Sequence, residues 1–528
     1  MAVGSEVRTG PSLDGLSTED LEGRQGLGHV RLAIVGGKHG PQPMQSDDGK
    51  LLLLHNGEIY NHHELRKELA GKVRFETKTD SEVILRLLER EYKGDLQAAL
   101  RRVLKELDGV YALAVSDGED IVIARDPLGV RQLYLGHKGK TLAFASERKG
   151  LQAVELDDAS TRLEPGHLAW VEEGRWIQKE FAQIDLQSVP TDLTDQEAAL
   201  RAYQQVLEQA LHKRTRDRDR VGVIFSGGID SVLIAHLLRQ SDVPFTCYCA
   251  GFRGSADLGS ARAVAEEFGF PIRCREFTLD DIQALLPQIM ETIEDRSQLQ
   301  VEVAIPIYAA VEAAAEAGER VLLTGQAADE LFGGYSWYAR IVDQEGYDSF
   351  IRHAITDIEY LYKETLERED KITMAHSIEL RVPYLDLAVV HTALRIDPRL
   401  KIHRGGDRLG KRIHRQLAER LGIPREIAWR VKEAAQHGAG IHDALRALAH
   451  RSGFTRECVD AADYCAQDSV TEVLGSCSRY GYRYGEAELW KDDEHVQCYL
   501  DTLAWKHGLL SENETQQLVP ALEDVAAD

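Results

Sequence analysis

Residues 221–231 join an apolar run to a loop of small and acidic residues, in the order Val-Gly-Val-Ile-Phe-Ser-Gly-Gly-Ile-Asp-Ser. The apolar run predicts a buried strand, and Ser226, Gly227 and Gly228 let the backbone turn sharply where that strand ends. A helix is expected from Ser231, so its N-terminal amides point at the loop and favour an anion. The segment matches neither the Walker A loop nor the dinucleotide fingerprint. We interpret it as a phosphate-binding loop.

The residue types in this loop suit a pyrophosphate group together with a divalent cation. Two hydroxyls and two glycine amides can hold the β- and γ-phosphates of ATP, and a carboxylate can bind the Mg²⁺ that neutralises them. The alternative is a tight turn without a ligand, which the combination of two serines, two glycines and an acid disfavours. The predicted phosphate-binding residues are Ser226, Gly227, Gly228 and Ser231, with Asp230 as the magnesium ligand.

A second apolar run, Arg320-Val-Leu-Leu, opens into Thr324-Gly-Gln-Ala-Ala-Asp-Glu330 in the same manner. Between the two loops, the sequence predicts strands over 244–251 and 272–277 and helices over 260–268 and 282–293. This alternation predicts a parallel sheet with helices on both faces and a ligand at the carboxyl ends of the strands. Beyond Ile341 the pattern is mainly helical.

Together with Asp370-Lys371 and Arg381-Val-Pro-Tyr-Leu-Asp386, these motifs make residues 221–440 resemble the synthetase domain of the asparagine synthetase family. The resemblance implies an α/β ATP-pyrophosphatase domain with a helical C-terminal part. The positions that the resemblance assigns are Ile224 and Ala250 at adenine, Thr324 and Gly325 at the ribose or α-phosphate, Asp329 with Asp230 on magnesium, Lys432 at the α-phosphate, and Arg381 at substrate or phosphate. The alternative for Lys432 is that it is an ordinary surface lysine.

The resemblance also implies a reaction in which the side-chain carboxylate of aspartate attacks the α-phosphorus of ATP, and ammonia then displaces AMP. Many family members carry Gly-Glu-Gly-Ser-Asp-Glu where this chain has Gly325-Gln-Ala-Ala-Asp-Glu330. Gln326 therefore replaces the carboxylate linked to adenylate formation, and it keeps hydrogen bonding without charge. This departure leaves open a cyclase similar to β-lactam synthetase. A non-catalytic homologue is a further alternative, although Asp230, Asp329 and Lys432 are all present.

The first part of the chain resembles the partner domain of the same family, a class II glutamine amidotransferase with an N-terminal-nucleophile fold. Bound glutamine needs a guanidinium for its carboxylate, a carboxylate for its ammonium and fixed dipoles for the oxyanion at its amide. By resemblance these are Arg31, Asp80, and the Asn56 side chain with the Gly57 amide. The remaining residues of the implied pocket are Leu32, Ala33, Ile34, Val35 and Glu58. The segments that carry the resemblance are Arg31–Val35, Gly40–Pro43, Asn56–Asn61, Thr79–Val83 and Arg125–Gly129.

Two of these residues also have simpler interpretations. Asn-Gly between short strands is typical of a hairpin turn, and Asp80 could cap the helix that follows it. Together, and in this order, the pocket residues outweigh both.

The expected nucleophile of that domain is missing, because the chain opens Met-Ala-Val-Gly-Ser and has no cysteine before Cys247. A class II amidotransferase attacks glutamine with the thiol of an N-terminal cysteine. Three explanations are open: a start placed downstream of the true one, a domain decayed into a scaffold, or a relative that uses another nitrogen nucleophile. Because the pocket residues are intact, we favour the misplaced start.

The length of 528 residues, 43% of them hydrophobic, predicts two domains with separate cores. We expect an amidotransferase-like domain over 1–184, a polar linker over 185–195 and an ATP-binding domain over 196–528. The ATP-binding domain should begin with a helix at Gln196–Thr215. The seven cysteines contain no C-x-x-C pair, which argues against a disulfide framework or a zinc site. Cys247 and Cys249 are expected in the core.

The formal net charge of −24 disfavours nucleic acid as a partner, because phosphate contacts need a basic surface. No apolar run is long enough to span a membrane, and no signal peptide is visible, so a cytoplasmic location is expected. The expected partners are small molecules: ATP, aspartate or a related carboxylate, and glutamine or ammonia. A homodimer is left open.

We predict that the 528-residue chain uses ammonium as nitrogen donor and releases no glutamate from glutamine, since the thioester cannot form without an N-terminal thiol. The assay measures glutamate against a heat-inactivated control. Turnover clearly above that control would show that another nucleophile exists. If a chain extended upstream to a cysteine hydrolyses glutamine, the misplaced start is supported and the decayed domain is excluded.

Overall fold

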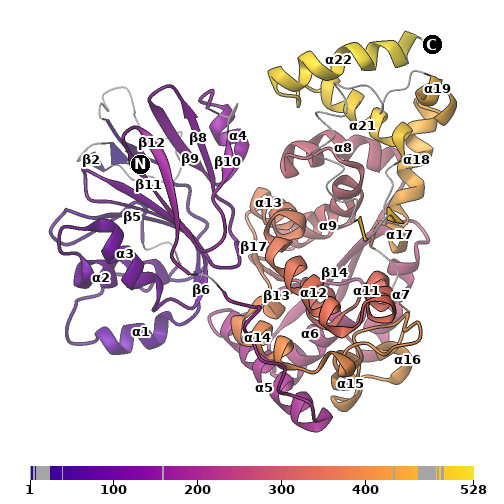
Figure 1. The fold of residues 1–528 in the computed structure, drawn as a ribbon, viewed down its shortest axis with the longest axis horizontal. Helices are drawn as coiled ribbons and strands as arrows, with labels where there is room; N and C mark the ends of the chain where they lie inside the picture. The colour runs from indigo at the N-terminus through magenta and orange to yellow at the C-terminus, as the bar shows by residue number, and fades with distance from the viewer. Residues whose placement is uncertain are drawn as a thin grey trace. The chain divides into compact units, whose positions relative to one another are not determined.

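The computed structural model describes residues 24–37, 40–156, 160–182, 184–431, 435–461 and 493–527, and the short strands β1 (Ala2–Val3), β2 (Glu6–Val7), β18 (Arg483–Tyr484) and β19 (Ala487–Glu488). Contacts divide the chain into two compact units, and Figure 1 labels their helices and strands. Unit 1 comprises Met1–Asp219, Gln326–Asp370 and Arg381–His414. Unit 2 comprises Arg220–Gly325, Lys371–Leu380 and Arg415–Asp528.

Unit 1 is built on a six-stranded antiparallel sheet in the order β12-β11-β7-β6-β5-β4. A second sheet has the order β10-β8-β9. The strands of the two sheets are β4 (Met44–Gln45), β5 (Leu52–Ile59), β6 (Gly109–Ser116), β7 (Ile121–Arg125), β8 (Tyr134–Lys138), β9 (Thr141–Ala145), β10 (Thr161–Arg162), β11 (His167–Glu172) and β12 (Arg175–Glu180). The short β3 (Gly26–Leu27) pairs with β1.

The two faces of the six-stranded sheet carry separate cores. Leu51 and Leu53 pack with residues of α1 (His62–Leu69), α2 (Asp80–Glu91) and α3 (Leu96–Leu104). Leu52 and Leu54 pack instead with residues at β8. Because successive side chains of a strand point to opposite faces, one run of leucines supplies both layers. The predicted α+β sandwich is confirmed.

The remaining elements of unit 1 are mainly helical. Helix α5 spans Gln196–Thr215, the range predicted from the sequence, and its first turn is capped by Asp195, whose Oδ1 accepts from the Ala198 amide at 2.8 Å. The other elements are α4 (Arg148–Gln152), α10 (Ala328–Phe332), α11 (Ser336–Gln344), α12 (Tyr347–Leu361), a π-helical turn (Tyr362–Leu366), α14 (Leu387–Arg395), and 3₁₀ turns at Pro383–Leu385 and Pro398–Leu400.

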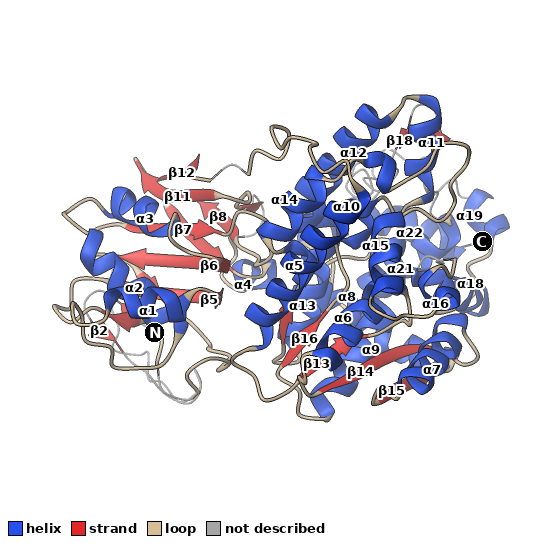
Figure 2. Cartoon of the chain, turned by 90° about the horizontal axis from the view of Figure 1, so that it is seen from below, coloured by secondary structure: helices blue, strands red, loops and turns tan. Residues whose placement is uncertain are grey.

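Unit 2 is built on a five-stranded sheet in the order β15-β14-β13-β16-β17, and the pairs among its first four strands are parallel. Figure 2 shows these strands among the helices that connect them. The predicted parallel α/β sheet is confirmed. Its strands and first helices are β13 (Val221–Ile224), β14 (Phe245–Phe252), β15 (Ile272–Phe277), β16 (Val321–Leu323), β17 (Glu379–Arg381), α6 (Ile229–Gln240), α7 (Ala256–Phe268), α8 (Leu279–Ile293) and α9 (Gln298–Glu316).

Strand β14 is buried on both faces. Tyr248 and Ala250 belong to a core with α8, α9 and the C-terminal helices, and Cys247 and Cys249, which alternate with them, are buried as predicted. The predicted helical C-terminal part is also confirmed. Its described helices are α13 (Glu367–Ala375), α15 (Arg412–Arg420), α16 (Arg425–Ala428), α17 (Ala435–Gly438), α18 (Ile441–Arg451), α19 (Arg456–Ala461), α21 (Glu494–Lys506) and α22 (Glu512–Ala527).

None of the helices in the described ranges combines the length and the hydropathy that crossing a membrane requires. The predicted domain boundaries near residues 184 and 196 stay a prediction.

Candidate active site

The turn between β13 and α6 depends on a glycine. β13 ends at Ile224 and α6 begins at Ile229, two residues earlier than predicted. Gly227, between them, has a φ of +68°, and a Cβ on it would lie 2.9 Å from backbone atoms of Ser260 and Ala261. Any other residue would meet both a left-handed backbone and a backbone clash. The predicted sharp turn is confirmed.

The loop presents hydroxyls and backbone amides at the start of a 12-residue helix. The Gly228 amide donates to Ser226 Oγ at 3.2 Å, and Ser231 Oγ donates to the Gly228 carbonyl at 3.1 Å. Gly228 precedes α6 and has no side chain with which to cap it. The first-turn amides of such a helix suit an external anion, because the helix dipole places partial positive charge there.

The end of β16 lies against the first turn of α6. A Cβ on Gly325 would lie 2.9 Å from the Cβ of Asp230 and 3.3 Å from the Ser231 amide nitrogen. The two strands are parallel neighbours, with Val223 opposite Leu323, so their carboxyl ends share one edge of the sheet. Unit 2 therefore brings the first predicted loop and the start of the second, Thr324–Gly325, together at the carboxyl ends of its strands.

The residues predicted beside adenine lie on neighbouring strands of the same sheet. Ile224 is opposite Tyr248 in the β13–β14 pair, and Ala250 follows two residues later on β14. Ala250 is buried and Ile224 is partly exposed. Their contact with adenine stays a prediction.

Four of the nine residues predicted to hold glutamine lie on or beside β5 in unit 1. Asn56, Gly57 and Glu58 belong to the strand itself, and Asp80 Oδ2 accepts from the Ile59 amide at 3.0 Å. The Asn56 amide donates to Ser146 Oγ at 3.5 Å. The structure therefore gathers the predicted oxyanion donors and the predicted ammonium partner around one strand.

Arg31 lies close enough to this strand to respond to its charges. Its guanidinium donates to the carbonyls of Val35, at 2.9 Å, and Gly37, at 2.7 Å. Burial lowers the pKa of Arg31, while the charges of Asp80 and Glu58 act to raise it. The charges of Arg31 and Asp80, predicted for the two ends of glutamine, are thus near enough to interact. The segment Leu32–Val35 lies between Arg31 and the bend at residues 35–37 to which its guanidinium binds.

The two simpler interpretations of these residues are wrong. Asn56 and Gly57 lie inside β5, where Gly57 is opposite Tyr111, and a Cβ on Gly57 would lie 2.0 Å from the Val110 carbonyl oxygen. Thr79, rather than Asp80, caps α2, because its side chain accepts from the Glu82 amide at 3.3 Å. A hairpin turn therefore does not explain Asn56-Gly57, and a helix cap does not explain Asp80.

Two family models match the chain. The model described as glutamine amidotransferase domain matches residues 7–182, and the model described as asparagine synthase matches residues 202–348 and 342–506. The chain belongs to the asparagine synthetase family. The resemblance found in the sequence is thereby confirmed for both parts of the chain.

Curated relatives agree with these models. "Putative asparagine synthetase (glutamine-hydrolyzing) 1" of Methanocaldococcus jannaschii is 33% identical, and the match covers 84% of this chain and 87% of the relative. Asparagine synthetase (glutamine-hydrolyzing) 1 of Arabidopsis thaliana is 31% identical over 82% and 73%. The enzyme of that name from Saccharomyces cerevisiae is 30% identical over 78% and 77%. Glutamine phosphoribosylpyrophosphate amidotransferase of B. subtilis, a solved structure, is 22% identical over 43% of this chain and 52% of that one, with a TM-score of 0.26.

Gln326, where this chain departs from the asparagine synthetase motif, has a hydrogen-bond partner in unit 1. Gln326 Nε2 donates to the carboxylate of Glu369, a fully buried side chain. Sequence reasoning missed this carboxylate, because 43 residues separate the two and no local pattern links them. The pair holds one amide and one carboxylate at the position where the family motif has a carboxylate alone.

Asp329, predicted as a magnesium ligand, lies on α10 in unit 1. Its Oδ1 pairs with Lys411 Nζ at 2.8 Å, a contact that the sequence did not suggest. The next residue, Glu330, accepts from the Tyr335 hydroxyl at 2.7 Å. Burial, followed by the charge of Asp329, raises the pKa of Glu330 to about 7. The role of Asp329 on magnesium stays a prediction.

Arg381 is buried in unit 1. Its guanidinium pairs with Glu58 at 3.0 Å and donates to the Arg214 carbonyl, and the Arg381 and Glu58 side chains are 1% and 4% exposed. These contacts favour a structural role for both residues, and the predicted contact of Arg381 with substrate or phosphate stays a prediction. Lys432 lies outside the described residues.

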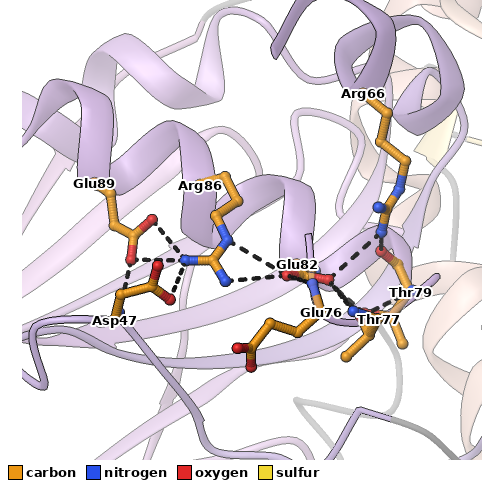
Figure 3. A network of polar contacts seen from close by, with 8 residues as sticks. All are labelled: Asp47, Arg66, Glu76, Thr77, Thr79, Glu82, Arg86 and Glu89. Carbon is orange, nitrogen blue, oxygen red and sulfur yellow. Dashed lines mark hydrogen bonds and ion pairs between the residues drawn. The ribbon is translucent and has the colours of Figure 1, made fainter. Parts of the chain in front are cut away.

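A network of polar contacts fixes the start of α2, where Asp80 lies (Figure 3). The Glu82 carboxylate accepts from the amides of Glu76 and Thr77, each at 2.7 Å, and from Arg86 Nη2 at 3.1 Å. Burial acts to raise the pKa of Glu82, but these hydrogen bonds outweigh it and hold that pKa below its usual value. The network orders the segment that precedes Asp80.

The ends of the network extend to neighbouring elements. Arg86 Nη1 also donates to Asp47 at 2.6 Å and to Glu89 at 2.9 Å. Arg66, on α1, donates to the Thr79 carbonyl at 2.6 Å. Figure 3 shows these side chains converging on the start of α2 from α1 and the segments around it.

We predict that Glu82→Gln lowers the free energy of unfolding by about 2–4 kcal/mol, because it leaves a buried arginine and two amides poorly matched. Glu68→Gln, whose side chain is 58% exposed, serves as the control and should change stability little. Because the folded-state pKa of Glu82 is lowered, its contribution is present at neutral pH and is lost as pH falls below about 4. Urea titrations at pH 7 and pH 3.5 measure both effects. Equal losses for Glu82→Gln at both pH values would contradict the charge as the cause.

Proposed function

We propose that this chain makes asparagine, as a carbon–nitrogen ligase that adenylates the side-chain carboxylate of aspartate. A carboxylate oxygen attacks the α-phosphorus of ATP, and pyrophosphate leaves with the electrons of the broken phosphoanhydride bond. Ammonia, supplied as such or from glutamine, then attacks the acyl carbon, loses a proton and releases AMP. Membership of the asparagine synthetase family supports this reaction, and the two-part architecture supports a role for glutamine in it.

The observation that carries the proposal is the convergence of two strand ends at the first turn of α6. Gly227 makes the turn that exposes the helix amides, and Gly325 brings the second strand end within contact of Asp230 and Ser231. A pyrophosphate group needs several fixed donors and little covalent assistance, because phosphoryl chemistry depends mainly on positioning and charge neutralisation. Ser226, Gly227, Gly228 and Ser231 are the residues we assign to it.

The residues at this turn also fit a magnesium ion. Asp230 lies in the first turn of α6 and offers the hard oxygen ligand that Mg²⁺ prefers, next to the loop assigned to phosphate. When bound there, the ion would neutralise negative charge on the pyrophosphate. Thr324 and Gly325 would contact the ribose or α-phosphate, Ile224 and Ala250 adenine, and Asp329 and Lys432 keep their predicted roles on magnesium and the α-phosphate.

The pair of Gln326 and Glu369 gives a physical account of the departure from the family motif. A carboxylate at this position is linked to forming the adenylate, and Gln326 has no charge. Glu369 supplies a carboxylate at hydrogen-bond distance from the Gln326 amide. This carboxylate is buried, and a charge acts strongly in such an environment. We therefore assign the carboxylate function of the motif to Glu369, oriented by Gln326.

The two alternatives make different demands on the chain. A cyclase that closes a ring within one substrate has no use for a glutamine pocket, whereas Arg31, Asn56, Gly57 and Asp80 are gathered around β5. A non-catalytic homologue has no need to keep the phosphate loop. Neither alternative is favoured by a feature of the structure. The cytoplasmic location and the homodimer stay predictions.

We predict that the chain, supplied with ATP, Mg²⁺, aspartate and ammonium, forms asparagine, AMP and pyrophosphate in equal amounts. Asp230→Asn should lower kcat/KM by about a hundredfold or more, because it weakens charge neutralisation at the phosphates. Asp280→Asn, a change at a side chain 84% exposed, is the matched control. The measurement is chromatographic separation of the nucleotides and amino acids. ADP and phosphate as stoichiometric products would exclude adenylation, and ATP consumption without ammonium uptake would favour a cyclase.

Exchanging the two side chains of the Gln326 and Glu369 pair tests the role assigned to its carboxylate. Glu369→Gln should lower kcat for aspartate-dependent AMP formation by about a hundredfold with little change in the KM for ATP, since only amides remain. The exchange Gln326→Glu with Glu369→Gln restores one carboxylate and one amide and should recover most of that loss. Glu359→Gln, at an exposed position of α12, is the control. An exchanged variant no more active than Glu369→Gln alone would contradict the role of the shared carboxylate.

A further inference from the structure

Two histidines and an aspartate meet in unit 1, outside the residues assigned to ATP and glutamine. His62 and His63 begin α1, and Asp217 lies two residues beyond the end of α5 at Thr215. His62 Nε2 is 3.2 Å from one carboxylate oxygen of Asp217, and His63 Nε2 is 2.8 Å from the other. Across the described ranges, this is the one group of three such side chains whose donor atoms lie within 4.8 Å of one another.

The spacing of these atoms suits a tetrahedral metal ion. Nitrogen and oxygen ligands about 2.0–2.2 Å from a zinc ion lie roughly 3.3 Å from one another. The two nitrogen–oxygen distances, 3.2 and 2.8 Å, are within about half an ångström of that spacing. His62 Nδ1 is buried and makes no hydrogen bond within the described part of the chain, so Nε2 is the atom through which this ring makes polar contact. Both rings therefore present Nε2 to the Asp217 carboxylate, one to each of its oxygens.

The neighbouring arginine does not cancel the charge available to a cation. Arg216 Nε is 3.9 Å from Asp217, but its guanidinium pairs with Glu64 at 2.9 and 3.1 Å and donates to the Tyr60 carbonyl. The positive charge of Arg216 is thus balanced by Glu64. Asp217 remains as the anion between two imidazoles.

Burial and exposure in the cluster suit a site that exchanges with solvent. The His62 side chain is 2% exposed and is fixed by its surroundings, whereas the His63 and Asp217 side chains are 44% and 23% exposed. A metal ion could therefore reach the cluster from solvent and keep a water molecule as its fourth ligand. Neutral imidazoles with one carboxylate are ligands that Zn²⁺ binds well in proteins.

We propose that His62, His63 and Asp217 bind one Zn²⁺ ion, with water as the fourth ligand. The ion would replace the hydrogen bonds between the rings and the carboxylate by three metal–ligand bonds. It would join the first helix of the amidotransferase-like part to the chain just after α5, across 154 residues of sequence. Because the ligands are assembled only in the folded chain, metal binding would stabilise the folded state.

Zinc titration of the metal-free full chain, prepared without a histidine tag and without nucleotide, tests the site. Isothermal calorimetry should give one more zinc equivalent for the unmodified chain than for His63→Gln or Asp217→Asn. The same zinc addition should raise Tm in the unmodified chain and leave Tm of the two variants nearly unchanged. His137→Gln, at an exposed histidine of β8, is the control and should behave as the unmodified chain does.

The comparison separates this site from other zinc ligands. Cysteines and acidic residues elsewhere are the same in the unmodified chain and its three variants. The difference in zinc stoichiometry and in Tm shift between these proteins therefore reports on the cluster alone. Both test variants change partly exposed side chains, and each is checked for native circular dichroism in the absence of zinc. Equal stoichiometry and equal Tm shifts in all four proteins would overturn the proposal and leave the cluster as a hydrogen-bonded bridge without metal.

Discussion

Charges buried in pairs hold the amidotransferase-like part of unit 1 to segments that return to it from much later in the sequence. Arg381 pairs with Glu58, and Arg131 pairs with Asp370, with every one of these side chains at most 5% exposed. Removing one member of such a pair leaves an uncompensated buried charge, which costs about 3–5 kcal/mol. Strand β5, which carries predicted glutamine-binding residues, is thus fixed by Arg381, which follows the predicted phosphate-binding loop in the chain.

The synthetase side depends on a different constraint, the close approach of backbone to backbone. Gly227 and Gly325 occupy places where a Cβ would meet neighbouring atoms at 2.9 Å. The donors they expose belong mainly to the main chain, so they are fixed by the fold and need little reorganisation when charge develops. In the proposed function, side-chain identity is decisive only where charge must be supplied, as at Asp230 and at Glu369.

The sequence predicted what is local and missed what is distant. The helix Gln196–Thr215 and the strand Ile272–Phe277 agree with the prediction at both ends. The helix is also marked locally, because Asp195 caps its first turn. Asn56-Gly57 has the local signature of a turn, yet pairing with β6 places it within a strand. The contact of Gln326 with Glu369 joins residues 43 apart, and no periodicity encodes such a pairing.

The path of the chain through the two units limits how the gene could be divided. Unit 1 contains residues from both sides of Arg220–Gly325, so a cut in the polar segment 185–195 would not release a finished module. The N-terminal fragment would lose the arginine that neutralises Glu58, and the C-terminal fragment would lose the arginine that neutralises Asp370. Each fragment would therefore need the other in order to fold. A split form of this protein would have to be made by co-expression of the two fragments. Recombination of one half with the half of another protein would be restricted to proteins that preserve both ion pairs.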